Sequence, residues 1–270
     1  MLSSSAAWLL EPERCSLVTA GEQPQLNEFL VTLDVDWAPD FVIDDVADLL
    51  VAAGVKATWF ITHSSAAVER LRQRGDLFEL GIHPNFLPGS SHGNTPRDVL
   101  DHVLSIVPDA LSSRSHAVFQ SAPILKLLLD ETPIRVDSSV LLPESPHIRP
   151  VPHRIGNRSL LRVPVFWADD YALANLESRW SIERYIPVAG CKTMDFHPIH
   201  VYLNTAEMRA YDGLKTRSRQ LTTLRTEDAA PFRNAGVGVR TMFRELLDRL
   251  AFHGASRCLR DLHGGSTAAH

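Results

Sequence analysis

The segment Phe29-Leu30-Val31-Thr32-Leu33-Asp34-Val35-Asp36 decides the fold class, because a run of apolar and β-branched residues ends abruptly in two carboxylates. Such a run predicts a buried strand whose carboxyl end is marked by the acids. In open α/β sheets the chemistry gathers at the carboxyl ends of the strands. An isolated Asp-x-Asp pair can also be two solvated loop acids, so the rest of the chain must support Asp34 and Asp36 as candidates.

The same pattern recurs along the chain, with helices between the apolar runs. Residues 44–53 repeat apolar side chains at helical spacing and stop at Gly54, which favours a helix end. We expect further strands over 56–62, 78–83, 115–119, 134–137, 160–166 and 193–197, and further helices over 67–73, 96–107, 122–129 and 239–252. This alternation implies parallel crossovers and an α/β fold, either a doubly wound sheet or a closed barrel.

The composition narrows the class of protein. The chain has 270 residues, of which 44% are hydrophobic, and its net charge of −5 gives no basic face for nucleic acid. Its cysteines, Cys15, Cys191 and Cys258, lie far apart without a CxxC pair, so we predict a reducing, cytoplasmic location. No apolar stretch approaches the roughly 20 residues of a membrane span. No basic residue precedes the short apolar patch near the N-terminus, so we expect no secretory signal.

Histidines follow the expected strands in the same way as the two aspartates. His83 ends the run 78–83, His92 lies nine residues later in a Ser-Ser-His-Gly turn, and His197 ends the last expected strand. One aspartate and two histidines can hold a divalent metal with a position left for water, while a further aspartate and histidine move protons. This is the equipment of a metal-dependent hydrolase, although each histidine alone could be a surface or packing residue.

Together and in this order, the segments resemble the polysaccharide deacetylase family, which has the NodB-homology fold and forms carbohydrate esterase family 4. The resemblance covers roughly residues 29–200 and rests on Thr32–Trp37, Ala57–Phe60, Glu79–His83, Arg114-Ser115-His116, Arg135–Ser139 and Phe196-His197-Pro198. It implies a distorted (β/α) barrel, often seven-stranded. We place this domain at 27–255, after an N-terminal extension (1–26) and before a flexible tail (256–270).

The resemblance also implies a divalent metal site, with Zn²⁺ as the expected ion, and hydrolysis of N-acetyl groups on sugars. We expect Asp36, His83 and His92 to hold the metal. The family's usual second histidine lies four residues after the first, where this chain has Leu87. His92 must then serve through a longer loop, or Asn85 takes part.

The remaining site residues receive roles in the same way. Asp34 would take a proton from the attacking water, and His197 would protonate the departing amine. Arg114 would orient Asp34. Asp137, or Asp169 as the second choice, would orient His197.

The expected partner is an N-acetylated saccharide or sugar nucleotide, such as an intermediate of a surface polysaccharide. Trp37, Trp59, Trp167 and Asp169 are our candidates for binding it. The sequence leaves the oligomeric state open. Two alternatives are an imidase or ureide hydrolase on the same barrel, and a sugar-binding relative that has lost the metal.

Overall fold

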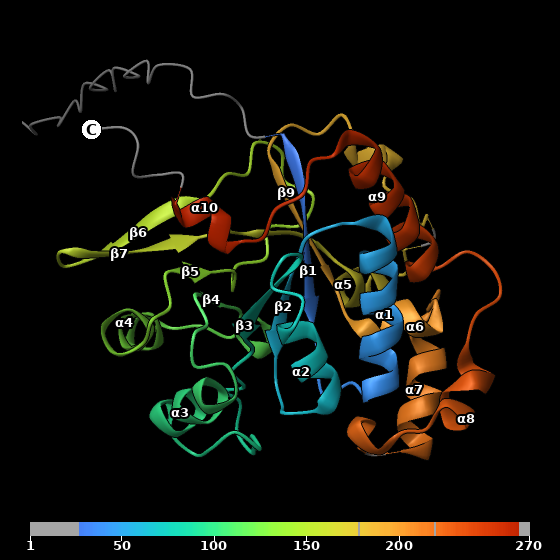
Figure 1. Cartoon of the computed structure of the whole chain (residues 1–270), viewed down its shortest axis with the longest axis horizontal. Helices are drawn as coiled ribbons and strands as arrows, with labels where there is room; N and C mark the ends of the chain where they lie inside the picture. Colours follow the sequence, from blue (N-terminus) through green and yellow to red (C-terminus); the bar gives the residue numbers. More distant parts are fainter. Residues whose placement is uncertain (1–26, 178, 219, 265–270) are drawn as a thin grey trace, which may run out of the picture.

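The computed structural model describes residues 27–264 except 178 and 219 (Figure 1). Within this part of the chain, nine strands form one sheet in the order β6-β7-β5-β4-β3-β2-β1-β9-β8. Every neighbouring pair is parallel except the β6–β7 hairpin. The strands are β1 (Glu28–Asp34), β2 (Ala57–Ile61), β3 (Phe78–Ile82), β4 (Ser112–Ser113), β5 (Val136–Asp137), β6 (Val151–Ile155), β7 (Arg158–Arg162), β8 (Val165–Ala168) and β9 (Cys191–Phe196).

Seven of the described strands, from β5 through β1 to β8, curl into the expected distorted barrel. Leu141, just beyond β5, forms an isolated parallel bridge with Val165 of β8. The Val165 N–H donates to Val140, and the Leu142 N–H donates to Val165. The segment after β5 therefore reaches the other edge of the sheet, and the β6–β7 hairpin projects outside the ring (Figure 1).

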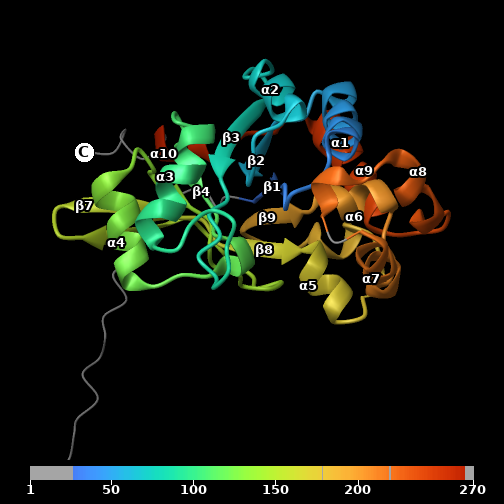
Figure 2. The same ribbon diagram turned by 90° about the horizontal axis from the view of Figure 1, so that it is seen from below.

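Helices surround the strands, as the view from below shows (Figure 2). They are α1 (Asp40–Ala53), α2 (Ala66–Arg72), α3 (Pro96–Ile106), α4 (Ala122–Glu131), α5 (Asp169–Ala174), α6 (Pro198–Leu203), α7 (Met208–Arg217), α8 (Thr226–Ala229), α9 (Val239–His253) and α10 (Arg260–Gly264), with short 3₁₀ turns η1 (His116–Val118), η2 (Glu183–Tyr185), η3 (Leu221–Thr223) and η4 (Ala230–Phe232). None of the described helices is long and apolar enough to cross a membrane.

Helix α1 shows how the sequence pattern becomes structure. Its buried side chains, Val42, Ile43, Val46 and Leu50, recur at helical spacing and pack into the main core. The helix ends at Gly54, whose φ of +63° is a left-handed conformation that glycine adopts without steric cost. The predicted helix and its end are therefore confirmed.

Two expected strands differ from the structure. Residues 116–118 form the 3₁₀ turn η1 instead of a strand, because Ala117 and Val118 adopt positive φ values of 55° and 46°. The single strand expected over 160–166 is divided into β7 and β8 around Pro164, which lacks the N–H that a strand ladder needs.

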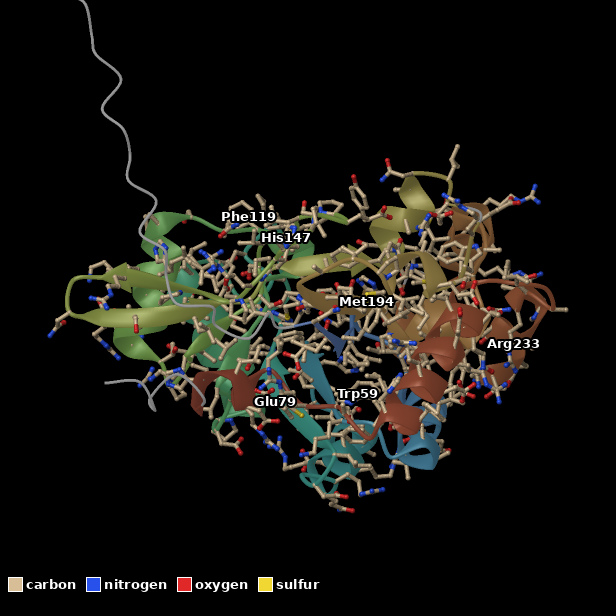
Figure 3. The ribbon with its side chains drawn as sticks, turned by 90° about the horizontal axis from the view of Figure 1, so that it is seen from above. Trp59, Glu79, Phe119, His147, Met194 and Arg233 are labelled. Carbon is tan, nitrogen blue, oxygen red and sulfur yellow. The ribbon has the colours of Figure 1, made fainter. Side chains whose placement is uncertain are left out.

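The end of the described chain closes the base of the barrel, opposite the carboxyl ends of the strands. Leu259 and Leu262 are buried there with Leu30 and Phe60. Figure 3 views this end and shows Glu79 beside α10, whose Arg260 N–H donates to the Glu79 carboxylate at 2.9 Å. The expected flexible tail is therefore wrong for its described part, up to residue 264. The N-terminal extension and the rest of the tail lie outside the described residues.

Candidate active site

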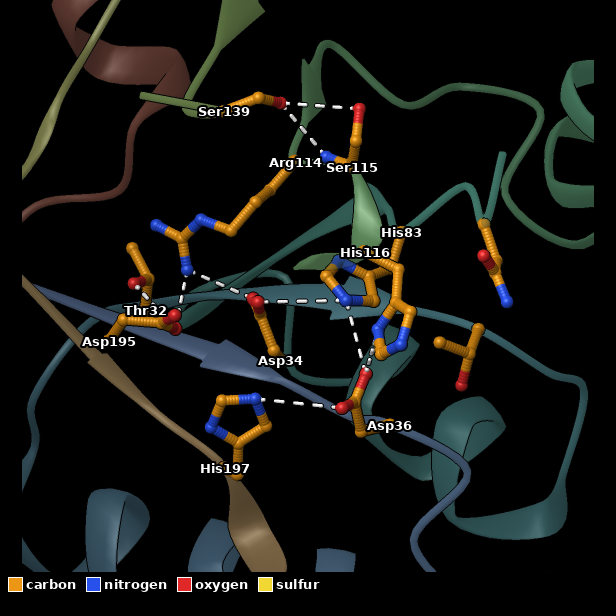
Figure 4. A network of polar contacts seen from close by, with 12 residues as sticks. Thr32, Asp34, Asp36, His83, Arg114, Ser115, His116, Ser139, Asp195 and His197 are labelled. Carbon is orange, nitrogen blue, oxygen red and sulfur yellow. Dashed lines mark hydrogen bonds and ion pairs between the residues drawn. The ribbon is translucent and has the colours of Figure 1, made fainter. Parts of the chain in front are cut away.

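The residues expected to carry the chemistry meet where the barrel strands have their carboxyl ends (Figure 4). Five strands supply them: Asp34 and Asp36 follow from β1, His83 from β3, Arg114 and His116 from β4, Asp169 from β8, and His197 from β9. Parallel pairing explains this meeting, because it brings the carboxyl ends of strands that are distant in sequence to one edge.

Asp36, His83 and His116 form a compact group of possible metal ligands, with one ligand atom of each lying within 4.8 Å of the others. Asp36 Oδ1 is 3.1 Å from His83 Nε2 and 3.0 Å from His116 Nδ1. Neither buried ring nitrogen of His83 has a well-formed hydrogen bond among the described residues. This group fits a divalent cation, because it offers one carboxylate and two imidazoles as ligands. The buried His83 ring, which has no hydrogen bond of its own, would gain a partner in the cation.

Within this group, Asp36 and His116 each stabilise the charged form of the other. Burial raises the pKa of Asp36, but the close contacts of its carboxylate with His116 and His83 and the nearby charge of His197 outweigh burial and hold that pKa well below 3.8. Burial lowers the pKa of His116, but the hydrogen bond and charge of Asp36 raise it above 6.5. The group therefore contains a carboxylate that stays ionised, as a metal ligand must.

Strained backbone accompanies two of these candidate ligands. Asp36 and Trp37 have φ values of 45° and 57°, and Ala117 and Val118, directly after His116, have 55° and 46°. Left-handed conformations are unfavourable for such residues and persist where the surrounding structure holds them, often at functional sites. The Trp37 N–H, for example, donates to Thr62 Oγ1 at 3.1 Å.

His92, our expected third ligand, is not part of the group. Its Nδ1 accepts a hydrogen bond from the Asn85 N–H at 3.1 Å, and its ring stacks on His102 at 5.0 Å. Burial lowers the pKa of His92 to about 4. The Asn85 side chain accepts from the Leu87 N–H, so it also serves the loop. His116 is the third member of the group instead. It follows β4, and β4 is the neighbour in the sheet of β3, which His83 follows.

The expected contact between Arg114 and Asp34 is present. Arg114 is fully buried, and its Nη1 donates to Asp34 Oδ1 at 2.9 Å. The other Asp34 oxygen lies 3.6 Å from His83 Nε2, and Asp34 is outside the ligand group. The same Arg114 Nη1 also donates to Asp195 Oδ1 at 2.5 Å, a contact that we did not predict.

Asp169, our second choice, is the partner of His197. Its Oδ1 lies 2.6 Å from His197 Nδ1, and its Oδ2 accepts the His197 backbone N–H at 2.8 Å. Burial lowers the pKa of His197, but the Asp169 carboxylate outweighs it and raises that pKa well above 6.5. Asp137, our first choice, is bound instead by Arg162 at 2.6 Å and Ser139 at 2.8 Å. Strand β8 is the neighbour of β9, whereas β5 is not.

Among the expected tryptophans, Trp37 lies beside the ligand group. It is partly exposed, and its ring centroid is 5.3 Å from that of His116. Trp59 is wholly buried against Phe78 in the core and is excluded from a substrate surface. Trp167 is 2% exposed and lines a separate pocket of about 90 Å³ with Glu144 and Tyr171 among its residues. Asp169 is fully buried and supports His197 rather than contacting a substrate.

Residues from the C-terminal third of the chain line one side of the site beside His197, which the sequence did not predict. His200 on α6 is buried, and its ring centroid is 5.8 Å from that of His197 and 4.6 Å from that of Tyr211 on α7. Burial lowers the pKa of His200 to about 3, so the ring is neutral. The segment after β9 therefore packs directly against the proposed proton donor.

The family model of WbmS-like polysaccharide deacetylases matches residues 31–215. The chain belongs to the polysaccharide deacetylase family.

Solved structures resemble this chain to different degrees. WbmS from Bordetella bronchiseptica, a candidate polysaccharide deacetylase of O-antigen biosynthesis, is 37% identical in sequence, with a TM-score of 0.73 over 83% of this chain and 91% of its own. Peptidoglycan deacetylase PdaC from Bacillus subtilis is a distant likeness at 12% identity, with a TM-score of 0.46 over 90% of this chain and 92% of its own. No curated protein sequence matches the chain.

Proposed function

We propose that this polysaccharide deacetylase family member is a metal-dependent hydrolase that removes N-acetyl groups from an amino-sugar substrate. The observation that carries the proposal is the group of Asp36, His83 and His116, with Asp34 and His197 beside it. Membership of the family supports an enzyme that acts on amide bonds of sugars.

Asp36, His83 and His116 would hold the cation, and Zn²⁺ suits one carboxylate and two imidazoles. Such an ion supplies Lewis acidity, which polarises a carbonyl and lowers the pKa of water. His92 and Asn85 are not needed for this binding, because their hydrogen bonds serve the loop.

Asp34 is suited to accept the proton of the attacking water. Its Oδ1 is held by Arg114, which leaves Oδ2 facing His83 at 3.6 Å, on the side of the ligand group. As water adds to the acetyl carbonyl carbon, Asp34 takes the proton that the water loses. A carboxylate placed in this way typically contributes about 10²–10⁴-fold to the rate.

His197 is suited to donate a proton to the leaving nitrogen. Its Nδ1 is bound to Asp169, and its Nε2 lies 3.6 Å from Asp36 Oδ2, so the second ring nitrogen faces the ligand group. The raised pKa keeps the imidazole protonated near neutrality. When the C–N bond breaks, the Nε2 proton passes to the amine, and acetate and a free amino sugar leave.

The similarity to WbmS supports a substrate from surface polysaccharide biosynthesis, either a saccharide or a sugar nucleotide. The buried free thiols Cys191 and Cys258 support a reducing, cytoplasmic setting. Trp37, beside the ligand group, is the aromatic side chain best placed to contact the sugar ring.

Metal analysis and acetate release test the proposal together. Purified protein should contain one divalent ion per chain, and it should release acetate from N-acetylated amino sugars, free or nucleotide-linked. Removing the metal with a chelator should abolish the release, and Zn²⁺ should restore it. Protein without affinity for divalent metals would contradict the proposal. Metal-loaded protein that hydrolyses cyclic imides but no acetylated sugar would favour the imidase alternative.

A further inference from the structure

One terminal nitrogen of Arg114, Nη1, donates to two carboxylates. Arg114 Nη1 donates to Asp34 Oδ1 at 2.9 Å and to Asp195 Oδ1 at 2.5 Å (Figure 4). Arg114 is 0% exposed and each aspartate is 5% exposed, so water screens these electrostatic contacts little. Asp195 lies on β9, two residues before His197, and our sequence analysis gave it no role.

The guanidinium is held on its other sides as well. Arg114 Nε donates to the Ser138 carbonyl at 3.2 Å, and Nη2 donates to Ser138 Oγ at 2.9 Å. The guanidinium carbon lies 4.5 Å from the centroid of the Phe60 ring. Because these contacts occupy Nε and Nη2, Nη1 is left to Asp34 and Asp195. Its placement relative to Asp34 therefore depends on Asp195.

A purely stabilising role explains Asp195 poorly. Burial raises the pKa of Asp195 well above 3.8 in spite of Arg114, which means that its ionised form is disfavoured there. Replacing a buried ion cluster by apolar residues is often neutral or even stabilising. The weak contact from Thr32 Oγ1, at 3.5 Å, adds little to hold β9 against β1. The contact of Asp195 with Arg114 therefore explains better why a carboxylate stands at this buried position.

We propose that Asp195 is a positioning residue of this active site: by sharing Arg114 with Asp34, it fixes the direction in which Asp34 accepts the proton. The inference rests on the proposed role of Asp34. Without Asp195, Asp34 would be the one carboxylate partner of Nη1, and it would move closer to that nitrogen, which would draw its second carboxylate oxygen away from His83.

A double-mutant cycle tests the inference. Four proteins are compared: wild type, Asp195→Ala, Asp34→Asn and the double variant. For each, kcat and KM for acetate release from an N-acetylated amino sugar are measured with metal content and thermal unfolding. Asp195→Ala removes the oxygen that accepts from Arg114 Nη1, so it should lower kcat by about 10- to 100-fold, as a misplaced catalytic group does. KM and metal content should change less than about twofold, because no ligand or substrate contact is lost.

The decisive comparison is in the Asp34→Asn background. If Asp195 acts through Asp34, adding Asp195→Ala there should lower kcat no further. Glu79→Gln is the matched control, since Glu79 is a buried carboxylate (2% exposed) at the opposite end of the barrel. It should leave kcat unchanged. Ser138→Ala removes the Oγ contact to Nη2 but keeps the carbonyl contact to Nε, so it should repeat the pattern of Asp195→Ala with a smaller loss of kcat, even if Asp195→Ala folds poorly.

The outcomes separate this inference from the proposed function. Losses of kcat that multiply in the double variant would overturn the positioning role alone, as would an Asp195→Ala protein with wild-type kcat. An Asp34→Asn protein with undiminished kcat would overturn both the role of Asp34 and the role of Asp195.

Discussion

Replacing His116 by alanine should release the metal that the site is proposed to bind. The variant removes one of the three candidate ligand atoms, while Asp36 and His83 keep their 3.1 Å contact. Loss of a group that merely orients a ligand costs about 10–100-fold in metal affinity. Loss of a ligand itself should cost at least about 100-fold, which corresponds to about 2.7 kcal/mol. The His116 side chain is 25% exposed, so its removal leaves no large cavity in the core.

His92→Ala is the matched comparison, because His92 is a histidine of the neighbouring loop that the sequence favoured as the ligand. Its Nδ1 is occupied by the Asn85 N–H. We therefore expect less than about a tenfold loss of metal affinity, below the range for groups that orient ligands. A competition titration with a chromophoric chelator measures both variants. Thermal unfolding without metal shows whether each remains folded.

The ranking of the two variants decides the assignment. A larger loss of affinity in His92→Ala than in His116→Ala would refute the reasoning and return the third ligand to the longer loop. Equal affinity in His116→Ala and wild type would show that Asp36 and His83 bind the ion without it.

Other consequences follow from the same structure. Asp169→Asn should lower turnover by about 10²–10⁴-fold with metal content unchanged, since it removes the charge that supports protonated His197; an unchanged kcat would remove Asp169 from the mechanism. Burial raises the pKa of Glu79 above 4.5, so its contribution to stability is complete below pH 4.5 and is lost as pH rises through the higher folded-state pKa. Glu79→Gln should flatten that part of the pH dependence of the unfolding free energy in urea titrations, and an identical slope would contradict the shift. Leu259→Ala should lower the unfolding free energy by about 2–5 kcal/mol because Leu259 is buried at the barrel base, whereas a change below about 0.5 kcal/mol would fit an unpacked tail.

The resemblance and the strand pattern predicted the fold and several site residues because both signals are local. Asp34, Asp36, His83 and His197 each end or follow an apolar run, and parallel strands bring such ends together. The two-residue strand β4 carried too weak a pattern to be separated from the turn after it, so the expected strand over 115–119 was wrong.

The sequence by itself determined which residue types stand at the strand ends, and hence that candidates for metal ligands, a base and an acid were available. It did not determine which strand ends are neighbours. Because β4 pairs with β3 and β8 pairs with β9, His116 joins His83, and Asp169 rather than Asp137 meets His197. Strand order results from pairing between segments far apart in the chain, and no local pattern encodes it. The contact of Asp195 with Arg114 depends on the same closure, since only the curled sheet brings β9 and β4 to face each other across the barrel.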